Sequence, residues 1–352
     1  MNGFGFLTTS LRLGPRLCHA FALAIALAAQ RSPAESPAPT ATLAAELQSR
    51  GWIVSSAQTP RGDWDLFLMR PDGSQRRALI ETPEFNEAGA RFSPDGHRLL
   101  YYRMPKGEAL DNNTYGTFDL VLADSNGQHA VVLGRGFPWA TWGPDGREIA
   151  CLQPKGIQIL DPRDRRVLRT LPRQGIVEQL IWSPDGTAFT GTANGLGPFW
   201  NIGLLPHGDG TIRAVSETDR YNCTPDWLPD GQHIVYARGI IPQQPGRAEL
   251  WMATVKTQTR TMLYAESTRH IYGACASPDG KYLLFTRSVA DLGAVGQSQT
   301  TMAVLRRSDT PMLGDDSPAL RREYPHANPP RWIDLGPGWE PHWTYSEAPA
   351  TP

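Results

Sequence analysis

At Trp182-Ser183-Pro184-Asp185-Gly186 an aromatic residue is followed at once by a turn-forming triplet. Proline presets φ at about −65°, and glycine readily supplies a positive φ. Aspartate can accept a hydrogen bond from the backbone two residues further on. Such a stretch reverses the chain between two antiparallel strands.

The same element occurs at four other places, residues 92–96, 142–146, 227–231 and 276–280. The five copies begin 50, 40, 45 and 49 residues apart, a spacing typical of four-stranded propeller blades. Apolar runs follow the turns, as strands buried on both faces require. They are residues 99–102, 149–152, 233–236 and 282–285.

A second turn recurs within the period, at residues 71–73, 124–127, 161–164 and 208–210. Two hairpin turns per period give four strands per period. An array of helices with this period would need apolar residues every 3.6 positions and few Pro-Asp-Gly turns. The sequence therefore predicts an all-β propeller of four-stranded antiparallel blades.

The two ends of the repeat predict how the ring closes. Glu340-Pro341-His342-Trp343 resembles Pro225-Asp226-Trp227 and predicts a sixth inner strand, while residues 52–56 and 65–80 supply three strands without an inner partner. One C-terminal strand plus three N-terminal strands would complete a sixth blade and leave no open blade interface. Residues 331–335 are expected to form the outer strand of the blade before it, and the propeller to span residues 49–346.

These Trp-Ser-Pro-Asp-Gly repeats, with strands such as Asp65-Leu66-Phe67-Leu68-Met69 between them, resemble those of the TolB-like β-propeller family. The resemblance covers residues 50–345 and implies six blades. It says little about function, because one fold serves many functions. TolB itself has an α/β domain before its propeller, and we expect this chain to lack it, because residues 30–51 are too few for a domain.

The N-terminus predicts export. Arg12 and Arg16 precede an uninterrupted apolar run over residues 20–29, which is too short for a membrane-spanning helix but suits a signal peptide. Cys18 precedes this run and is not placed as a lipid-attachment cysteine. We expect a signal peptide over 1–29, a flexible leader over 30–48, a tail over 347–352, and a periplasmic or secreted mature protein without a membrane span.

Composition narrows the partners. The chain has 34 Lys+Arg against 35 Asp+Glu and no basic stripe, so no nucleic-acid partner is expected. Three cysteines follow the leader, Cys151, Cys223 and Cys275, without CxxC spacing. Buried free thiols are the favoured interpretation, and a single disulfide between two of the three is the alternative.

Catalytic motifs are not found: no GxSxG, HExxH, Walker A or GxGxxG stretch occurs. We therefore predict no catalytic residues, no metal site and no cofactor. The aspartates of the repeats each stand alone in a hairpin, whereas Ca²⁺ needs six to eight oxygens, so they are interpreted as turn residues. The tryptophans 142, 182, 227 and 343 occupy equivalent positions and are interpreted as packing residues between blades.

A propeller most often binds its ligand at the mouth of the central channel, so residues just before each inner strand are the candidates. The predicted ligand-binding set is Glu87, Trp139, Glu178, Asn222, His270, Tyr272, Glu340 and His342. Solvated loop residues are the competing interpretation. Two insertions, residues 105–117 and 307–330, could carry function or lack order.

The sequence favours a non-enzymatic binding module of the bacterial cell envelope that recognises a protein, peptide or glycan. The alternative is a single-domain propeller enzyme acting on carbohydrates, a polysaccharide lyase or sugar-ester hydrolase, with its site at the channel mouth. A purely structural scaffold is a third possibility. The sequence alone names neither the ligand nor the oligomeric state.

Overall fold

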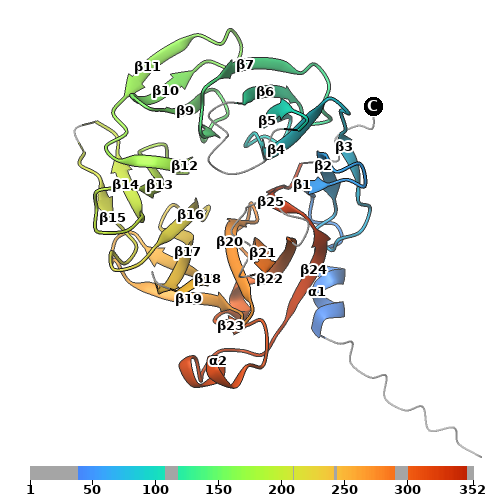
Figure 1. Cartoon of the computed structure of the whole chain (residues 1–352), viewed down its shortest axis with the longest axis vertical. Helices are drawn as coiled ribbons and strands as arrows, with labels where there is room; N and C mark the ends of the chain where they lie inside the picture. Colours follow the sequence, from blue (N-terminus) through green and yellow to red (C-terminus); the bar gives the residue numbers. More distant parts are fainter. Residues whose placement is uncertain (1–38, 108–117, 209, 242–243, 290–299, 347–352) are drawn as a thin grey trace, which may run out of the picture. The chain divides into compact units, whose positions relative to one another are not determined.

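The computed structural model describes residues 39–107, 118–208, 210–241, 244–289 and 300–346. Within them six β-sheets stand around a common centre as the blades of a propeller (Figure 1). Each blade has four antiparallel strands in order from an inner strand to an outer strand, and the fifth blade has one strand more. The predicted six-bladed, all-β propeller is therefore confirmed.

The first three blades take their strands from the two chain ends and from the first half of the chain. Blade 1 consists of β25 (Trp339–Thr344), β1 (Trp52–Gln58), β2 (Trp64–Met69) and β3 (Arg77–Ile80). Blade 2 consists of β4 (Phe85–Phe92), β5 (Arg98–Pro105), β6 (Asp119–Asp124) and β7 (Val131–Arg135). Blade 3 consists of β8 (Ala140–Trp142), β9 (Ile149–Gln153), β10 (Gly156–Leu160) and β11 (Val167–Leu171).

The other three blades follow in chain order. Blade 4 consists of β12 (Ile176–Trp182), β13 (Ala188–Ala193), β14 (Asn201–Pro206) and β15 (Arg213–Ala214). Blade 5 consists of β16 (Asn222–Trp227), β17 (His233–Ile241), β18 (Gln244–Thr254), β19 (Arg260–Ala265) and β23 (Met312–Leu313). Blade 6 consists of β20 (Arg269–Ala276), β21 (Tyr282–Val289), β22 (Thr301–Arg306) and β24 (Trp332–Pro337), the predicted outer strand.

The ring closes in blade 1 as predicted. The C-terminal strand β25 pairs antiparallel with β1, and Trp343 lies opposite Ile53. Figure 1 shows the red C-terminal strand beside the blue N-terminal ones. The side chain of Trp343 is 3% exposed, and its indole N–H donates to the backbone oxygen of Arg50 at 2.7 Å. A single strand from the far end of the chain thus seals the last blade.

The repeated turns have the predicted geometry. In blade 3 Asp145 accepts a hydrogen bond from the backbone N–H of Arg147 at 2.9 Å, and Gly146 has a φ of +70°. The corresponding bonds reach Asp95, Asp185, Asp230 and Asp279 at 2.9–3.1 Å. The aspartates therefore act in their turns, as the sequence predicts.

Neighbouring turns also touch. A side chain built on Gly146 would lie 3.5 Å from Pro94, and one on Gly186 would lie 3.5 Å from Pro144. The turns of successive blades therefore pack against each other. They lie at the end of the channel where the C-termini of the inner strands are. Glycine is favoured there by its positive φ, because a Cβ at these positions would meet the neighbouring proline only at ordinary contact distance.

Residues before the first strand are more ordered than predicted. Helix α1 (Pro39–Leu47) packs between blades 6 and 1 through Leu43 and Leu47, which are 1% and 0% exposed. Glu46 anchors it through Tyr282 and Arg306. The leader predicted over 30–48 thus ends in a packed helix. The predicted signal peptide, residues 30–38 and the tail over 347–352 lie outside the described residues.

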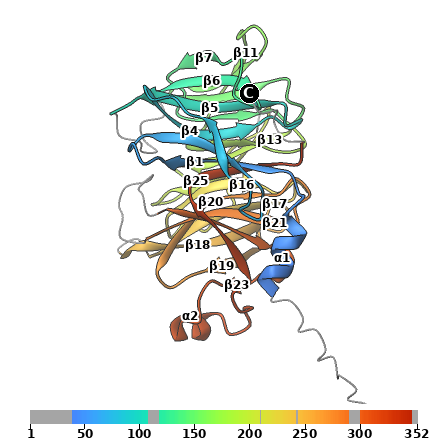
Figure 2. The same cartoon turned by 90° about the vertical axis from the view of Figure 1, so that its right-hand side faces the viewer.

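The insertion over 307–330 is ordered too. It contains η2 (Arg307–Asp309), the strand β23 and α2 (Pro318–Glu323), seen at the lower end in Figure 2. Although it leaves from blade 6, β23 pairs parallel with β19 of blade 5, and Leu320 of α2 is fully buried. The insertion therefore ties two blades together. Most of the insertion over 105–117 lies outside the described residues.

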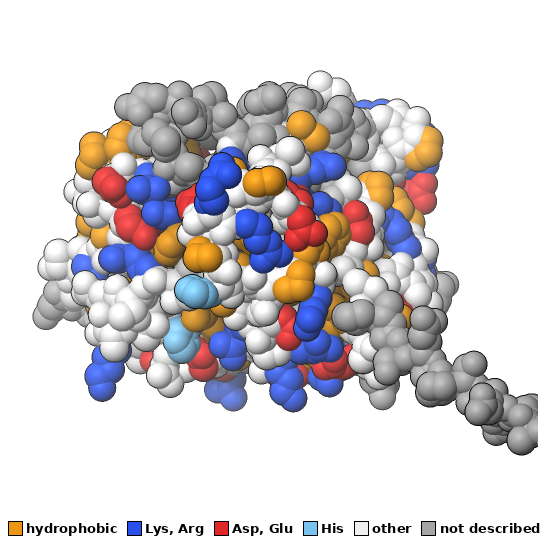
Figure 3. All heavy atoms as spheres, turned by 90° about the horizontal axis from the view of Figure 1, so that it is seen from below, with side chains coloured by type: hydrophobic (Ala, Val, Ile, Leu, Met, Phe, Trp, Pro, Cys, Tyr) orange, Lys and Arg blue, Asp and Glu red, His pale blue; other side chains and the backbone are white. Residues whose placement is uncertain are grey.

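One face of the molecule carries a mixture of charges. On the face seen in Figure 3, basic and acidic side chains are interspersed among polar and apolar ones. Charged side chains also pair elsewhere on the molecule, as Arg169 does with Glu148 at 2.6 Å. No helix among the described residues is long and apolar enough to cross a membrane.

Candidate functional site: a closed waist and a wide pocket

The inner strands carry a β-bulge at a shared level. In each of five strands one residue, three positions before the end-of-strand aromatic or its equivalent, has a positive φ, between +48° and +64°. These residues are Gly89, Gln179, Thr224, Gly273 and Glu340. Each sits where the pairing register with the next strand shifts. Bulges and left-handed non-glycine residues are often retained at functional positions, so this level is a candidate site.

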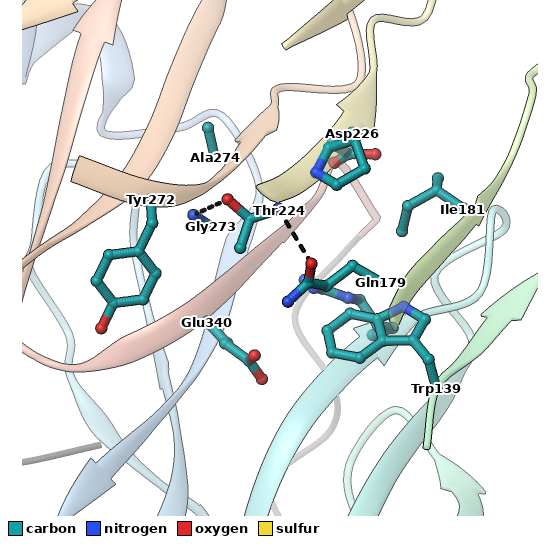
Figure 4. Close-up of a pocket in the computed structure, with 11 residues that line it drawn as sticks. Trp139, Gln179, Ile181, Thr224, Asp226, Tyr272, Gly273, Ala274 and Glu340 are labelled. Carbon is teal, nitrogen blue, oxygen red and sulfur yellow. Dashed lines mark hydrogen bonds between the residues drawn. The ribbon is translucent and has the colours of Figure 1, made fainter. Parts of the chain in front are cut away.

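Side chains at this level link one blade to the next. The side-chain oxygen of Gln179 in blade 4 accepts the backbone N–H of Thr224 in blade 5 at 3.1 Å. The hydroxyl oxygen of Thr224 accepts the backbone N–H of Gly273 in blade 6 at 3.0 Å. Both bonds are drawn in Figure 4. The bulge turns each N–H toward its neighbour, and a polar side chain there satisfies it.

We call this level the waist, because it narrows the channel to a small cavity. The cavity holds about 20 Å³, enough for one water molecule. All six blades line it; among its residues are Trp139, Gln179, Thr224, Tyr272 and Glu340 (Figure 4). The indole of Trp139 takes the place of a bulge residue in blade 3. At this level the lining side chains leave space for little more than one water molecule.

A second pocket lies where the inner strands end, on the side of the repeated turns. It has a volume of about 620 Å³, within the range of small-molecule and peptide sites, and we call it the wide pocket. Its walls are mainly aromatic rings and prolines. The aromatic residues are Phe92, Trp142, Trp182, Trp227, Trp343 and Tyr345, and the prolines are 94, 144, 184, 229 and 278.

The hydroxyl groups in these walls are already engaged. The side-chain oxygen of Ser277 accepts the backbone N–H of Tyr282 at 3.0 Å and its hydroxyl bonds Asp279. Ser93 makes the same pair of contacts in blade 2. The serines that recur in the turns therefore serve the turns, and the wall is left mostly apolar toward a ligand.

Charged and polar groups gather instead at the floor of the wide pocket, one residue before the aromatic level. Arg91 and Asp226 project there from blades 2 and 5, which stand opposite each other in the ring. Burial raises the pKa of Asp226 to about 6, against the opposing effect of Arg91. His342 accepts the backbone N–H of Phe92 at Nδ1, 3.2 Å away, and burial lowers its pKa to about 3.

Four of the eight predicted ligand-binding residues reach these two sites. Trp139, Tyr272 and Glu340 line the waist cavity, with exposures of 5%, 7% and 6%. His342 lines the wide pocket. The structure thus brings residues from blades 1, 3 and 6 together. Trp139 directly precedes its inner strand as predicted, whereas Tyr272, Glu340 and His342 lie within theirs.

Glu87 lies elsewhere, fully buried in β4 beside Asp65 of β2. The two carboxyl groups hydrogen-bond each other, and Glu87 also binds the hydroxyl of Thr82. Burial, aided by the charge of Asp65, raises the pKa of Glu87 to about 8. Asp65, whose pKa burial raises to about 6, also pairs with Arg61 at 2.9 Å. This pair joins blades 1 and 2, and the raised pKa values indicate that Glu87 keeps its proton near neutral pH.

The other three predicted residues have local roles in the described structure. The amide of Asn222, fully buried, donates to the backbone oxygens of Glu217 and Arg220. The ring of His270 lies 5.4 Å from that of Tyr272, and burial lowers the pKa of His270 to about 4. Glu178 is half-buried in β12.

Sequence reasoning missed Arg91, Gln179, Thr224 and Asp226. All four lie inside the inner strands, one or three residues before the aromatic of the repeat. Alignment of the five repeats on that aromatic would have pointed to them, because these two columns vary from blade to blade and hold a polar residue in several blades. The prediction relied on residues before the inner strands, whereas much of the site lies within those strands.

The three cysteines among the described residues form no disulfide. Cys151, Cys223 and Cys275 are free thiols, and burial raises the pKa of each. Among the described residues, no three His, Cys, Asp or Glu side chains are grouped so as to hold a metal ion.

Comparison with known proteins identifies the fold. No protein-family profile and no curated protein sequence matches the chain. TolB from Acinetobacter baumannii is similar in structure, with a TM-score of 0.60 and 15% identity over 84% of this chain and 67% of that one. A chain of the nidogen/laminin complex is similar with a TM-score of 0.52 and 11% identity, over 73% and 90% of the two chains. At such identities a likeness shows the fold alone: this chain has a six-bladed β-propeller fold, similar to that found in TolB.

Proposed function

We propose that the chain is a non-enzymatic binding module of the bacterial cell envelope, and that its wide pocket takes up a segment of a partner polypeptide. The observation that carries this proposal is the wide pocket itself, about 620 Å³ walled by tryptophans and prolines. Aromatic side chains are enriched where proteins bind other proteins, because they bury much apolar surface at little entropic cost. The closed waist gives such a segment a floor.

The wall chemistry favours a polypeptide over a glycan. A polyhydroxylated ligand needs many free hydrogen-bonding groups, whereas the hydroxyls of Ser93 and Ser277 are already bonded within their turns. An apolar side chain needs none of these. The few polar groups at the floor suit one anchored polar contact within an otherwise apolar interface.

The location in the envelope rests on the sequence of residues 1–29 and on nothing in the described structure. If residues 1–29 are a signal peptide, they are removed on export, and protein recovered from the periplasm or medium lacks them. An intact Met1 in that fraction, seen by mass spectrometry, would contradict it.

The predicted ligand set enters this proposal in part. His342 contacts the pocket in which we place the segment, and Trp139, Tyr272 and Glu340 support its floor. A ligand-binding role for Glu87, Glu178, Asn222 and His270 stays a prediction. So does the carbohydrate-enzyme alternative, which release of reducing ends or unsaturated sugars from polysaccharides would establish.

Selection of a random peptide library displayed on phage tests the proposal. Ala276 occupies in blade 6 the position that is aromatic in the other blades, and it lines the wide pocket. Ala276→Trp should therefore fill the pocket with a ring type that this level already accommodates. Val131→Trp, on an outer strand at a residue 45% exposed, adds the same ring away from the pocket.

We expect selected peptides to bind wild type and Val131→Trp alike, and Ala276→Trp at least about tenfold more weakly. Equal binding to a folded Ala276→Trp variant would place the site elsewhere, and selection without enrichment over several rounds would remove the polypeptide proposal.

A further inference from the structure

Arg91 stands between the waist cavity and the wide pocket and lines both. Its guanidinium makes one long hydrogen bond, 3.5 Å to the backbone oxygen of Pro341, and lies 5.6 Å from the ring centre of Trp139. Among the described residues no acidic side chain lies within salt-bridge distance of it. A guanidinium has five N–H donors, so most of those of Arg91 are available to a ligand.

A second donor belongs to His342, which lines the same pocket. A backbone N–H can only donate, so the bond from Phe92 shows that Nδ1 of His342 is the acceptor. The ring is neutral, because burial lowers its pKa to about 3, so its proton is on Nε2.

We propose that the floor of the wide pocket binds a carboxylate group, which the guanidinium of Arg91 engages while the rest of the ligand packs on the aromatic walls. This inference deepens the binding-module proposal, because it names the chemical group that the pocket selects. A carboxylate fits the planar fork of arginine through two parallel hydrogen bonds.

The surroundings of Arg91 favour a singly charged organic acid over phosphate. Asp226 lines the same floor, and its repulsion of an anion grows with the charge of that anion, so a doubly charged phosphate is disfavoured more than a carboxylate. No other arginine or lysine is among the residues that line either pocket. The walls are aromatic and apolar, so the remainder of the ligand is apolar.

Asp226 makes the binding dependent on pH. The groups that face it are Arg91 from β4, Cys275 from β20, and Glu340 and His342 from β25. His342 stays neutral, since its pKa is about 3, and the thiol of Cys275 stays protonated, since burial raises its pKa to about 12. Burial raises the pKa of Asp226 to about 6, so Asp226 loses its negative charge as pH falls through this value. A bound carboxylate is then repelled less and should bind more tightly.

The test uses 3-phenylpropionate and its amide, 3-phenylpropionamide, as probes of equal shape and different charge. Binding to the mature protein is followed by NMR and calorimetry. We expect saturable binding of the acid, at least about tenfold tighter than that of the amide. Equal binding of acid and amide, or absence of saturable binding of the acid, overturns the proposal.

Variants locate the group. Arg91→Gln should abolish the preference for the acid, whereas Arg147→Gln, at an arginine side chain 86% exposed in a rim turn, should leave it unchanged. Arg91→Lys keeps the charge without the fork and should retain a weaker preference, so the test survives if Arg91→Gln folds poorly. A full preference in a folded Arg91→Gln variant contradicts the inference.

The pH dependence supplies an independent readout. Acid binding to wild type should tighten severalfold as pH falls from about 7.5 to about 5.5, while the probe itself, with a carboxyl pKa of about 4–5, stays ionised. Asp226→Asn should bind the acid more tightly at the higher pH and lose this dependence. Glu340→Gln, which changes the neighbouring carboxyl group, should keep the pH dependence. If Glu340→Gln loses the pH dependence and Asp226→Asn retains it, the pH dependence does not come from Asp226.

Two sources of the carboxylate are separated by two further probes. N-acetylphenylalanine carries the carboxylate of a chain end, and N-acetylphenylalanyl-aspartamide carries only that of an acidic side chain. If small acids bind and no displayed peptide does, the carboxylate site stands and the polypeptide proposal fails. If displayed peptides bind wild type and Arg91→Gln equally, the polypeptide proposal stands and the carboxylate site fails.

Discussion

The level of the repeated turns and the waist lie a few residues apart on the same inner strands, yet they are built on opposite principles. At the turns five of the six blades use the same residues for the same purpose, as Asp145 and Asp185 do in accepting the N–H two residues on. At the waist no two neighbouring blades use the same residue, from Trp139 in blade 3 to Gln179 in blade 4. Repetition therefore marks what holds the fold, and its absence marks where a site can be built.

The largest effect should come from a repeated position. Trp343→Ala removes a side chain 3% exposed from the closing strand and should lower the free energy of unfolding by about 3–5 kcal/mol. Chemical denaturation measures this, with Trp200→Ala, at a residue 37% exposed, as the control that should cost far less. Equal costs for the two variants would mean that β25 does not seal the ring.

An unrepeated pair should make stability depend on pH. Glu87 has a pKa of about 8 in the folded protein and an ordinary value of about 4.3 in the unfolded chain. The folded state therefore holds a proton that the unfolded state has lost, and the free energy of unfolding should fall as pH rises from about 4 to about 8. Asp65, with a raised pKa of about 6, acts in the same direction.

Glu87→Gln should flatten this decline, because a glutamine can still donate to Asp65 but does not titrate. Denaturation curves at several pH values measure the slope. A wild type whose stability rises over this interval, or a Glu87→Gln variant with an unchanged slope, would contradict the raised pKa of Glu87.

A smaller effect is expected at the waist. Thr224→Val keeps the shape of the side chain but removes the oxygen that accepts the N–H of Gly273, at a cost of about 1–3 kcal/mol for the unpaired donor. Thr286→Val is the matched control, because the hydroxyl of Thr286 is buried without a hydrogen-bond partner in the described structure. If both variants cost the same, the bond between blades 5 and 6 contributes nothing of its own.

The fold could be predicted from the sequence because the same turn motif, with the same physical role, recurs several times. A single Pro-Asp-Gly turn proves little, but five copies at blade spacing leave few architectures. Ring closure followed from the same pattern, since Trp343 is a repeat aromatic without its turn.

The site could be predicted only in part, for two physical reasons. Polarity was used as a sign of the channel mouth, but Asn222 is polar because it bonds two backbone oxygens in its own loop. Arg91 and Asp226 lie inside strands, where a charged residue is identified as functional only once its neighbours are known. The left-handed bulge that turns the N–H of Thr224 toward Gln179 is a backbone feature with no residue type of its own.

The smallest effect should come from a repeated but solvated residue. Asp145→Ala removes the acceptor of one turn hydrogen bond from a side chain 60% exposed, so water replaces it and the cost should be about 0.5–1 kcal/mol. Gly146→Val in the same turn should cost more, about 1–3 kcal/mol, because a β-branched residue is strained at a φ of +70°. The two turn residues thus separate backbone strain from hydrogen bonding.

Calcium should not shift the melting temperature of wild type or of either variant, because a lone aspartate offers too few of the six to eight oxygens that Ca²⁺ takes. A calcium-induced rise in wild type that Asp145→Ala abolishes would show that this repeated level, and not only the unrepeated waist and floor, holds a site.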